Sequence, residues 1–343
     1  MVSESEMTTD KFELLQVTLL CDEQVGMMTL PKVALESLAA DLVRTARGVI
    51  AVCTVDHGCV CYLLSLGKQP KWEKLEAKFN GVKQYPIMAP LLDGSTLILN
   101  NRRFKGSFIA GKYDPRRDTY RGMAITDNFA GQFDNVRAAF QVDDGRVLFF
   151  FNQLDDANEI AVVALDLSTK TWTILREGEY IPSESSQIMM ADGNIMFVGG
   201  VDMDGVDVDD DDDEQELSRC NIYDVKKNQF RRGEYMIFGR AHAGICLMPD
   251  HHVFVAGGHS YMGGICEEYN PYENEWLLIP RVLPRLNKTR CLLMGGDSIL
   301  IAGCDEDGDW SNFYIYDINT KKYRDIEAPD NDHITGVEFI PLY

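Results

Sequence analysis

The sequence predicts an all-β fold: a closed ring of six small antiparallel sheets with four strands each. Short apolar runs separated by turn residues predict the strands, most clearly in the stretch from Arg240 to Arg281. The same unit recurs about every 50 residues. Inner runs such as Ile245–Leu247 and Val253–Val255 are apolar on both faces, so each sheet needs neighbours on both sides.

A pair of side chains marks each repeat. An aromatic or apolar residue in the third strand stands seven positions before an aromatic residue in the fourth strand. These pairs are Tyr113 and Tyr120, Leu165 and Trp172, Tyr223 and Phe230, Tyr269 and Trp276, and Tyr316 and Tyr323, with a weaker copy at Ser65 and Trp72. Four strands at this period predict the blades of a β-propeller.

Glycine pairs and an aromatic pair give the second half of the chain a more specific character. The runs 192–200 and 253–258 are apolar strands that end in Gly199-Gly200 and Gly257-Gly258, and Tyr269-Asn270-Pro271 precedes Trp276. These residues resemble the second strand and the third-to-fourth strand motif of kelch repeats. The resemblance covers residues 48–343 and implies a six-bladed kelch-type β-propeller of four-stranded antiparallel blades.

The amino-terminal part predicts a short extension before the propeller. Residues 1–9 are polar and predict a disordered tail, and residues 10–47 predict an extension with one helix from Pro31 to Ala46. Leu30-Pro31 with its downstream leucines resembles the opening of an F-box, which would recruit a ubiquitin-ligase scaffold. The favoured alternative is a helix that covers one end of the ring or a blade edge.

The first blade lacks an inner strand next to it in sequence. Its other three strands lie between Gly48 and Glu76, and the inner strand has two candidates, Thr335–Ile340 and Leu38–Thr45. The carboxyl-terminal run is favoured because it joins the two ends of the chain and leaves no unpaired edge. The other blades are predicted at about 84–125, 137–175, 185–235, 240–281 and 289–326.

Composition excludes some classes of partner. The net charge of −21, from 33 basic and 54 acidic residues, disfavours nucleic acid and anionic membrane surfaces. The nine cysteines show no disulfide framework or metal-ligand spacing, and the amino terminus is no secretory signal. These observations predict a cytoplasmic or nuclear protein with reduced thiols, and we expect a monomer.

The acidic insertion from Asp202 to Glu216 has three interpretations. Alternating aspartates around Gly205 could bind calcium, but the register of a calcium loop would put Gly200 at the first carboxylate position. The dense like charges favour a solvated, disordered loop, and contact with a basic partner is the third possibility.

The resemblance also implies a binding face. In kelch-type propellers, loops between the second and third strands and loops between blades build one face, which in some members holds acidic peptides. The residues that we predict there as a partner-binding set are Arg102, Arg103, Arg240, His242, His259, Tyr261, Arg285 and Trp310. Such a set suits an acidic or phosphorylated peptide. Alternatively, Arg240 and Arg285 only bridge blades to backbone carbonyls and aspartates.

The sequence predicts neither catalysis nor a cofactor or metal. Its six histidines form no metal-spaced motif, and no nucleophile elbow or phosphate loop is present. We therefore predict a non-enzymatic interaction module that binds a protein partner on one face, as a scaffold or a ubiquitin-ligase substrate receptor. Two alternatives stay open: a small-molecule enzyme in which His242, His259 and a carboxylate converge at the axial pocket, and a cytoskeletal binder of actin filaments.

Overall fold

The computed structural model divides the chain into two compact units, Met1–Arg47 and Gly48–Tyr343. The residues that it describes are 18–21, 24–27, 48–55, 58–65, 70–76, 79, 86–100, 107–126, 133–142, 145–153, 158–201, 216–259, 264–279, 283–294, 297–305, 308–329 and 334–340. In the first unit, β1 (Thr18–Cys21) pairs antiparallel with β2 (Gln24–Met27). The predicted tail and the predicted helix lie outside the described residues.

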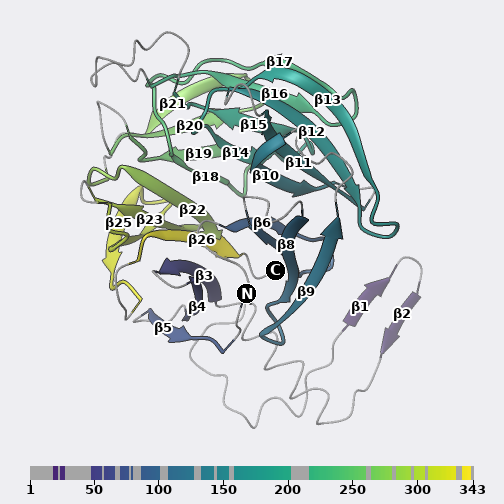
Figure 1. Cartoon of the computed structure of the whole chain (residues 1–343). Helices are drawn as coiled ribbons and strands as arrows, with labels where there is room; N and C mark the ends of the chain where they lie inside the picture. The colour runs from purple at the N-terminus through teal and green to yellow at the C-terminus, as the bar shows by residue number, and fades with distance from the viewer. Residues whose placement is uncertain are drawn as a thin grey trace. The chain divides into compact units, whose positions relative to one another are not determined.

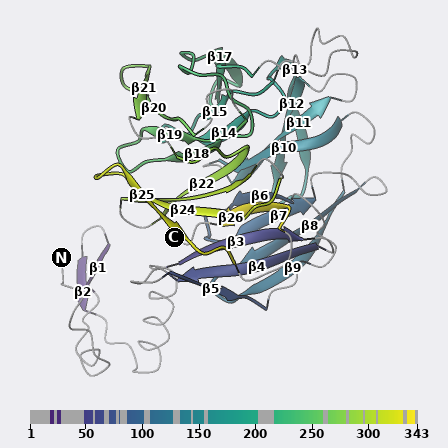
Figure 2. The same cartoon turned by 90° about the vertical axis from the view of Figure 1, so that its left-hand side faces the viewer.

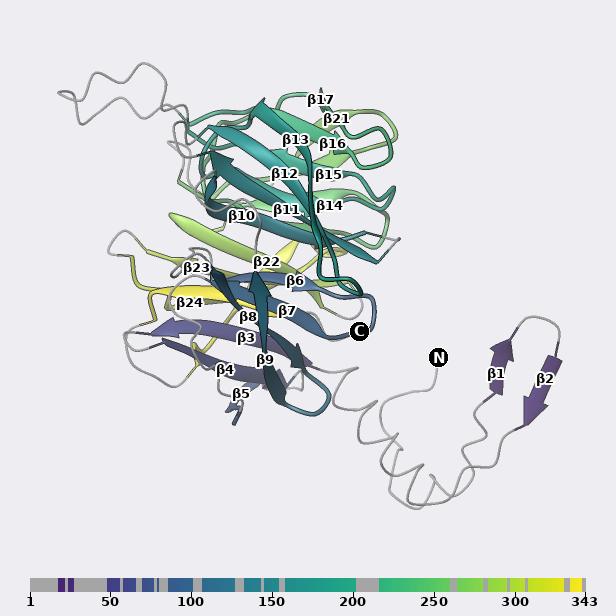
Figure 3. The ribbon, with the colours of Figure 1, turned by 45° about the vertical axis from the view of Figure 1, so that its right-hand side comes forward.

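The second unit is an all-β propeller with six four-stranded antiparallel blades, as predicted (Figure 1). Blade 1 contains β26 (Gly336–Ile340), β3 (Gly48–Val55), β4 (Gly58–Ser65) and β5 (Lys71–Lys74); blade 2 contains β6 (Pro86–Pro90), β7 (Thr96–Asn100), β8 (Ser107–Asp114) and β9 (Thr119–Thr126); blade 3 contains β10 (Phe133–Gln141), β11 (Arg146–Gln153), β12 (Glu159–Asp166) and β13 (Trp172–Tyr180). Blade 4 contains β14 (Ser186–Met189), β15 (Ile195–Val198), β16 (Cys220–Asp224) and β17 (Gln229–Arg232); blade 5 contains β18 (Gly244–Leu247), β19 (Val253–Ala256), β20 (Cys266–Asn270) and β21 (Glu275–Ile279); blade 6 contains β22 (Lys288–Met294), β23 (Ser298–Cys304), β24 (Asn312–Asp317) and β25 (Lys322–Ile326). Figure 3 shows the strands of blade 3 following one another from β10 on the inside to β13 on the outside.

The carboxyl-terminal strand closes the ring. β26 pairs antiparallel with β3, with Val337 opposite Cys53 and Phe339 opposite Ala51. Figures 1 and 2 both show this strand beside the first strand of the propeller. The prediction that the two ends of the chain build one blade is therefore confirmed. The competing candidate, 38–45, lies outside the described residues.

The aromatic pairs seen in the sequence are cross-strand neighbours. In five blades the two members of a pair are direct Cα partners, as in Tyr269 and Trp276. In blade 1 the prediction was one residue wrong, because Trp72 lies opposite Leu64 and Ser65 lies opposite Lys71. The connection between β4 and β5 holds one more residue, and this register buries Leu64 completely.

Large apolar side chains fill the space between neighbouring blades. Between blades 3 and 4, the ring of Phe150 lies 5.0 Å from that of Phe197 and 5.5 Å from that of Tyr223. Each such pair contributes about 0.5–1.5 kcal/mol beyond the area that it buries. This packing explains why the inner strands are apolar on both faces, since each blade is covered on both sides.

Burial also determines the state of the cysteines. All eight cysteines of the described part of the propeller are free thiols, and most of them are buried. Burial raises the pKa of Cys53 and of Cys220 to about 12. Thiols of such high pKa are protonated at neutral pH and act as small apolar core groups. Among the described residues, no helix has the length and apolar character of a membrane span.

Candidate functional site

A cavity of about 480 Å³ runs along the axis of the propeller and is lined from the inner strands of all six blades. We call it the axial channel. Its walls come from β6, β10, β14, β18, β22 and β26 and from the residues just before β14 and β18. A concave site at the centre of the ring is the natural place for a ligand or a partner side chain, because many elements converge on it.

The two ends of the axial channel differ in chemistry. All inner strands start at the same face of the ring, because each follows the outer strand of the preceding blade. Toward these starts lie the polar and charged residues of the lining, with Arg137, Gln187 and Arg290 among them, beside apolar residues such as Ile87 and Ile245. Residues later in the strands, such as Phe140 and Leu292, are apolar. We call the polar end the mouth.

The mouth opens on the face that the sequence predicted to be functional. This linker face consists of the loops between second and third strands and between blades; its described residues include 181–185, 199–201, 216–219, 233–243, 257–259, 283–287 and 308–311. The opposite turn face consists of the tight turns, including 91–95, 190–194, 248–252 and 271–274.

A histidine–carboxylate pair joins blades 4 and 5 at the mouth. His242 Nε2 donates to Glu184 Oε2 at 2.9 Å, and the His242 backbone N–H donates to the Glu184 carbonyl at 3.0 Å. The hydrogen bond from His242 lowers the pKa of Glu184, although partial burial opposes the shift. The carboxylate is therefore ionised at neutral pH.

Both partners of this pair have unusual backbone conformations. Glu184 has a φ of 58° and His242 a φ of 54°, a left-handed region that non-glycine residues seldom adopt. Such conformations cost free energy and tend to gather at functional sites. The surrounding loops hold the two residues there, because the His242 carbonyl also accepts the backbone N–H of Thr289 at 3.0 Å.

A second histidine lies nearby on the linker face. His259 Nδ1 lies 2.8 Å from Glu216 Oε1, and the His259 side chain is 51% exposed. His259 and Lys288 both add positive potential at Glu184. The loops of blades 4 and 5 thus bring His242, His259 and two carboxylates close together.

Arg290 is a mouth residue that sequence reasoning missed. Its Nε donates to Glu338 Oε1 at 2.7 Å, which links blade 6 to blade 1, and its guanidinium lies 5.9 Å from the ring centre of Trp310. Trp310 is 5% exposed, so the guanidinium of Arg290 lies next to a buried ring. A charged residue inside an apolar inner strand was the available signal, at Arg290, at Glu338 and also at Arg137 in β10.

Arg240 is buried and already paired, whereas a binding residue must be exposed to its partner. Its side chain is 2% exposed and lies 2.5 Å from Glu267 Oε1, and Glu267 is fully buried. Its guanidinium also donates to the carbonyls of Gly257 and Ile265, at 3.2 and 2.7 Å. This geometry matches the bridging alternative, and we do not include Arg240 in the surface open to a partner.

The remaining predicted residues are distributed as follows. Arg285 is exposed in the loop before β22 on the linker face. Arg102, Arg103 and Tyr261 lie outside the described residues, as does the acidic insertion up to residue 215. For these positions the partner-binding hypothesis and the calcium hypothesis stay predictions.

One cluster on the turn face has the donor types of a metal site. Asp250, His252 and Glu268 place their ligand atoms within 4.8 Å of one another, and His252 Nδ1 lies 2.5 Å from Glu268 Oε1. His251 is in the turn before β19, as predicted. Lys321 Nζ lies 3.7 Å from Glu268 Oε2, so the carboxylate already has a cationic neighbour. This cluster could hold a divalent cation but does not need one.

The comparisons with known proteins add no identification: a scan against protein-family models found no match, and a search of the curated proteins found none either.

Proposed function

We propose that this chain is a kelch-type interaction module that binds a protein partner at the mouth of the axial channel, as a scaffold or a substrate receptor. One observation carries the proposal. The mouth holds hydrogen-bonded pairs that are satisfied internally yet reach solvent: the side chains of His242 and Glu184 are 28% and 41% exposed, and those of Arg290 and Glu338 are 37% and 32% exposed.

Half-exposed pairs suit reversible binding. A partially exposed ion pair contributes only about 0–1 kcal/mol of stability. Each member can therefore leave the other and bind a group of a partner protein at a small cost in free energy. Arg290, His242 and the exposed Lys288 would face acidic or phosphorylated side chains. The apolar end of the axial channel could accept an apolar side chain of the same segment.

The glycine pairs support the kelch-type assignment. A Cβ at Gly199 would lie 2.1 Å from the Arg240 carbonyl oxygen, and a Cβ at Gly258 would lie 2.4 Å from that of Ala241. In both blades the glycine pair thus packs closely against the backbone of the loop that leads into blade 5. The free, mostly buried thiols favour a reducing compartment, which supports our proposal of a cytoplasmic or nuclear location.

The test is affinity capture from cell extract with matched variants. His242→Asn/Arg290→Gln alters the mouth; asparagine tolerates the left-handed φ of position 242. The control is Leu92→Ser, at a position 70% exposed on the turn face. We expect defined partners to bind the wild type and the control and to be absent from the mouth variant. Equal capture by all three folded proteins, checked by circular dichroism, would exclude the mouth as the binding site.

A small-molecule enzyme is the second candidate. The strained Glu184 and His242 beside a cavity of about 480 Å³ favour it, because ligand sites are of this size and often hold strained residues. Incubation with a metabolite extract, followed by mass spectrometry, tests it. Consumption of a compound by the wild type and not by His242→Asn would support catalysis, and an unchanged extract would leave the interaction module as the function.

A further inference from the structure

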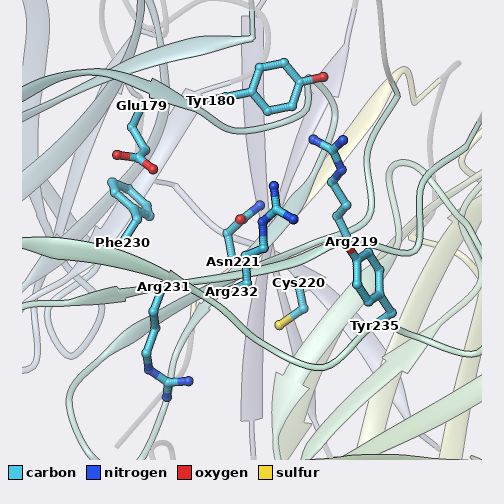
Figure 4. A pocket seen from close by; sticks show the side chains of 9 residues that line it. All are labelled: Glu179, Tyr180, Arg219, Cys220, Asn221, Phe230, Arg231, Arg232 and Tyr235. Atoms are coloured by element: carbon cyan, nitrogen blue, oxygen red, sulfur yellow. The ribbon is translucent and has the colours of Figure 1, made fainter.

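A second concave site lies far from the axis, between the outer strands of blades 3 and 4. Its volume is about 150 Å³, and it is lined from the end of β13, from β16 and its preceding residue, and from β17 and the loop after it. Figure 4 shows Arg219, Asn221 and Arg232 close together in this pocket, with the rings of Tyr180 and Tyr235 on either side of Arg219.

The strand geometry explains why two arginines meet here. Asn221 and Arg232 are cross-strand partners in β16 and β17, so their side chains lie on the same face of blade 4. Arg219 precedes Asn221 by two positions and therefore projects to that face as well. Arg231 is one position out of phase, and Figure 4 shows its side chain directed away from the other two.

The two arginines of the pocket have no acidic partner among the described residues, where neither Arg219 nor Arg232 forms an ion pair. The one carboxylate in the lining, Glu179, is already engaged, because Arg176 donates to its Oε2 through Nε at 3.0 Å and through Nη2 at 2.8 Å.

A cationic groove in blade 2 provides a contrast. There Lys112 pairs with Asp93, and Arg117 pairs with Asp114 at 3.5 Å. Two neighbouring guanidiniums that line one concave site without such a carboxylate partner indicate a place for an external anion.

Aromatic contact pre-orients one of the guanidiniums. The Arg219 guanidinium carbon lies 5.0 Å from the centre of the Tyr180 ring. A cation–π contact of this kind holds the planar group in place while its N–H donors stay available at the edges. Asn221 adds an amide that can donate a further hydrogen bond to an oxygen anion.

We propose that Arg219, Arg232 and Asn221 bind a phosphate monoester in this pocket. A phosphate monoester carries a charge of about −1.5 to −2 at neutral pH and three acceptor oxygens, which two guanidiniums and an amide match in charge and donor number. The group could belong to a phosphorylated side chain of a partner protein or to a small phosphorylated compound. This site is independent of the mouth.

Calorimetric titration of the full chain tests the proposal. The probes are O-phosphoserine, an end-blocked phosphoserine tetrapeptide and inorganic phosphate, at physiological ionic strength. We expect one-site binding with a Kd below about 1 mM for at least one probe. Arg219→Ala and Arg232→Ala should each weaken binding about tenfold or more, because each removes a charge-assisted hydrogen bond.

Arg231→Ala is the matched control, since it removes the same charge from the neighbouring position of the same strand, where the side chain borders the pocket but points away from Arg219 and Arg232. It should weaken binding by less than about threefold. Absence of saturable binding of all three probes would overturn the proposal, and so would equal weakening by Arg231→Ala, which would indicate long-range electrostatics. Retained binding of the probes by His242→Asn/Arg290→Gln would show that this site binds its ligand independently of the mouth.

Two further readouts specify the ligand. Tighter binding of the tetrapeptide than of free O-phosphoserine would assign the site to a partner protein, and equal binding to a small phosphorylated compound; both support phosphate recognition. Affinity should also fall as the pH drops through about 6, because the ester then gains a proton and loses one charge while the arginines stay charged.

Discussion

The junction of blades 4 and 5 and the outer rim between blades 3 and 4 use arginine in opposite ways. At the junction, Arg240 is 2% exposed and paired with the fully buried Glu267. At the rim, Arg232 is exposed, and Arg219 contacts a tyrosine ring instead of a carboxylate. The difference indicates that an arginine of the ring can serve a ligand only where the fold leaves its donors unused.

The physical reason lies in desolvation. A buried guanidinium must have partners for its charge and its N–H groups, so Arg240 takes Glu267 and two backbone carbonyls. Glu267 also accepts the backbone N–H groups of Ile237 and Phe238, at 2.7 and 3.3 Å. The pair thus organises the loop that leads into blade 5, and it cannot be exchanged for a ligand without unfolding that loop.

Removing Arg240 should have the largest effect on stability. Arg240→Ala leaves the Glu267 carboxylate buried without its counter-charge, so we expect the free energy of unfolding to fall by about 3–5 kcal/mol. Urea denaturation followed by tryptophan fluorescence measures the change. Arg240→Ala/Glu267→Gln also removes the unpaired buried charge and should recover part of the lost free energy of unfolding. A loss below about 1 kcal/mol for the single variant would mean that the pair resembles a surface salt bridge.

Substitution of a glycine at the same junction should have the second largest effect on stability. Gly258→Ala places a Cβ 2.4 Å from the Ala241 carbonyl oxygen at a φ of +87°, so both the clash and the backbone strain oppose folding. We expect a loss of about 2–4 kcal/mol.

The control for this variant isolates the clash from the strain. Gly193→Ala has a similar φ of +81°, with nothing within 4 Å of the added Cβ, and should cost only about 1 kcal/mol. Thermal unfolding of the two variants side by side gives the difference. Equal losses would show that close packing at the glycine pair contributes nothing.

The mouth pair should have a smaller, pH-dependent effect. The pKa of Glu184 is lowered in the folded protein, so its contribution to stability is present above the unfolded pKa and is lost as pH falls through the folded pKa. Because the side chain is 41% exposed, the contribution should be only about 0.5 kcal/mol. Melting temperatures of the wild type and Glu184→Gln should differ at pH 7 and converge as the pH falls below about 4. A difference that persists in acid would assign the effect to packing.

The rim arginines should have the smallest effect on stability. Arg219→Ala and Arg232→Ala should change the free energy of unfolding by less than about 0.5 kcal/mol, because neither supports a buried group. Urea denaturation checks this under the conditions used for Arg240→Ala. A loss above about 1 kcal/mol from either variant would show that the rim arginines are structural as well, and the contrast with Arg240 would fail.

Much of the fold could be predicted because its signals are local. The pair Tyr223 and Phe230 stands at a fixed spacing because a short turn brings the two residues into register, and five blades share this arrangement. Closure by the run 335–340 could also be predicted, since an unpaired strand edge is unfavourable in any ring. The register of Trp72 was missed because one additional residue in a turn leaves no mark in composition.

The candidate site could be predicted only in part. His242 and His259 were placed on the correct face, because the order of the strands decides which loops lie together. Their partners Glu184 and Glu216 belong to another blade, and Arg290 and Glu338 meet across the closure of the ring. Contacts between residues so far apart in the chain depend on how the blades pack, which sequence spacing does not express.

The sequence by itself determined the strands, their order within each blade, the number of blades and the strand that closes the ring, because hydrophobic period and turn chemistry act over a few residues. Only the tertiary structure decided which arginines pair with groups of the fold itself. Arg240 and Arg232 are the same residue type, and their environments differ because Glu267 lies beside one of them in the packed blades, while no described carboxylate pairs with the other.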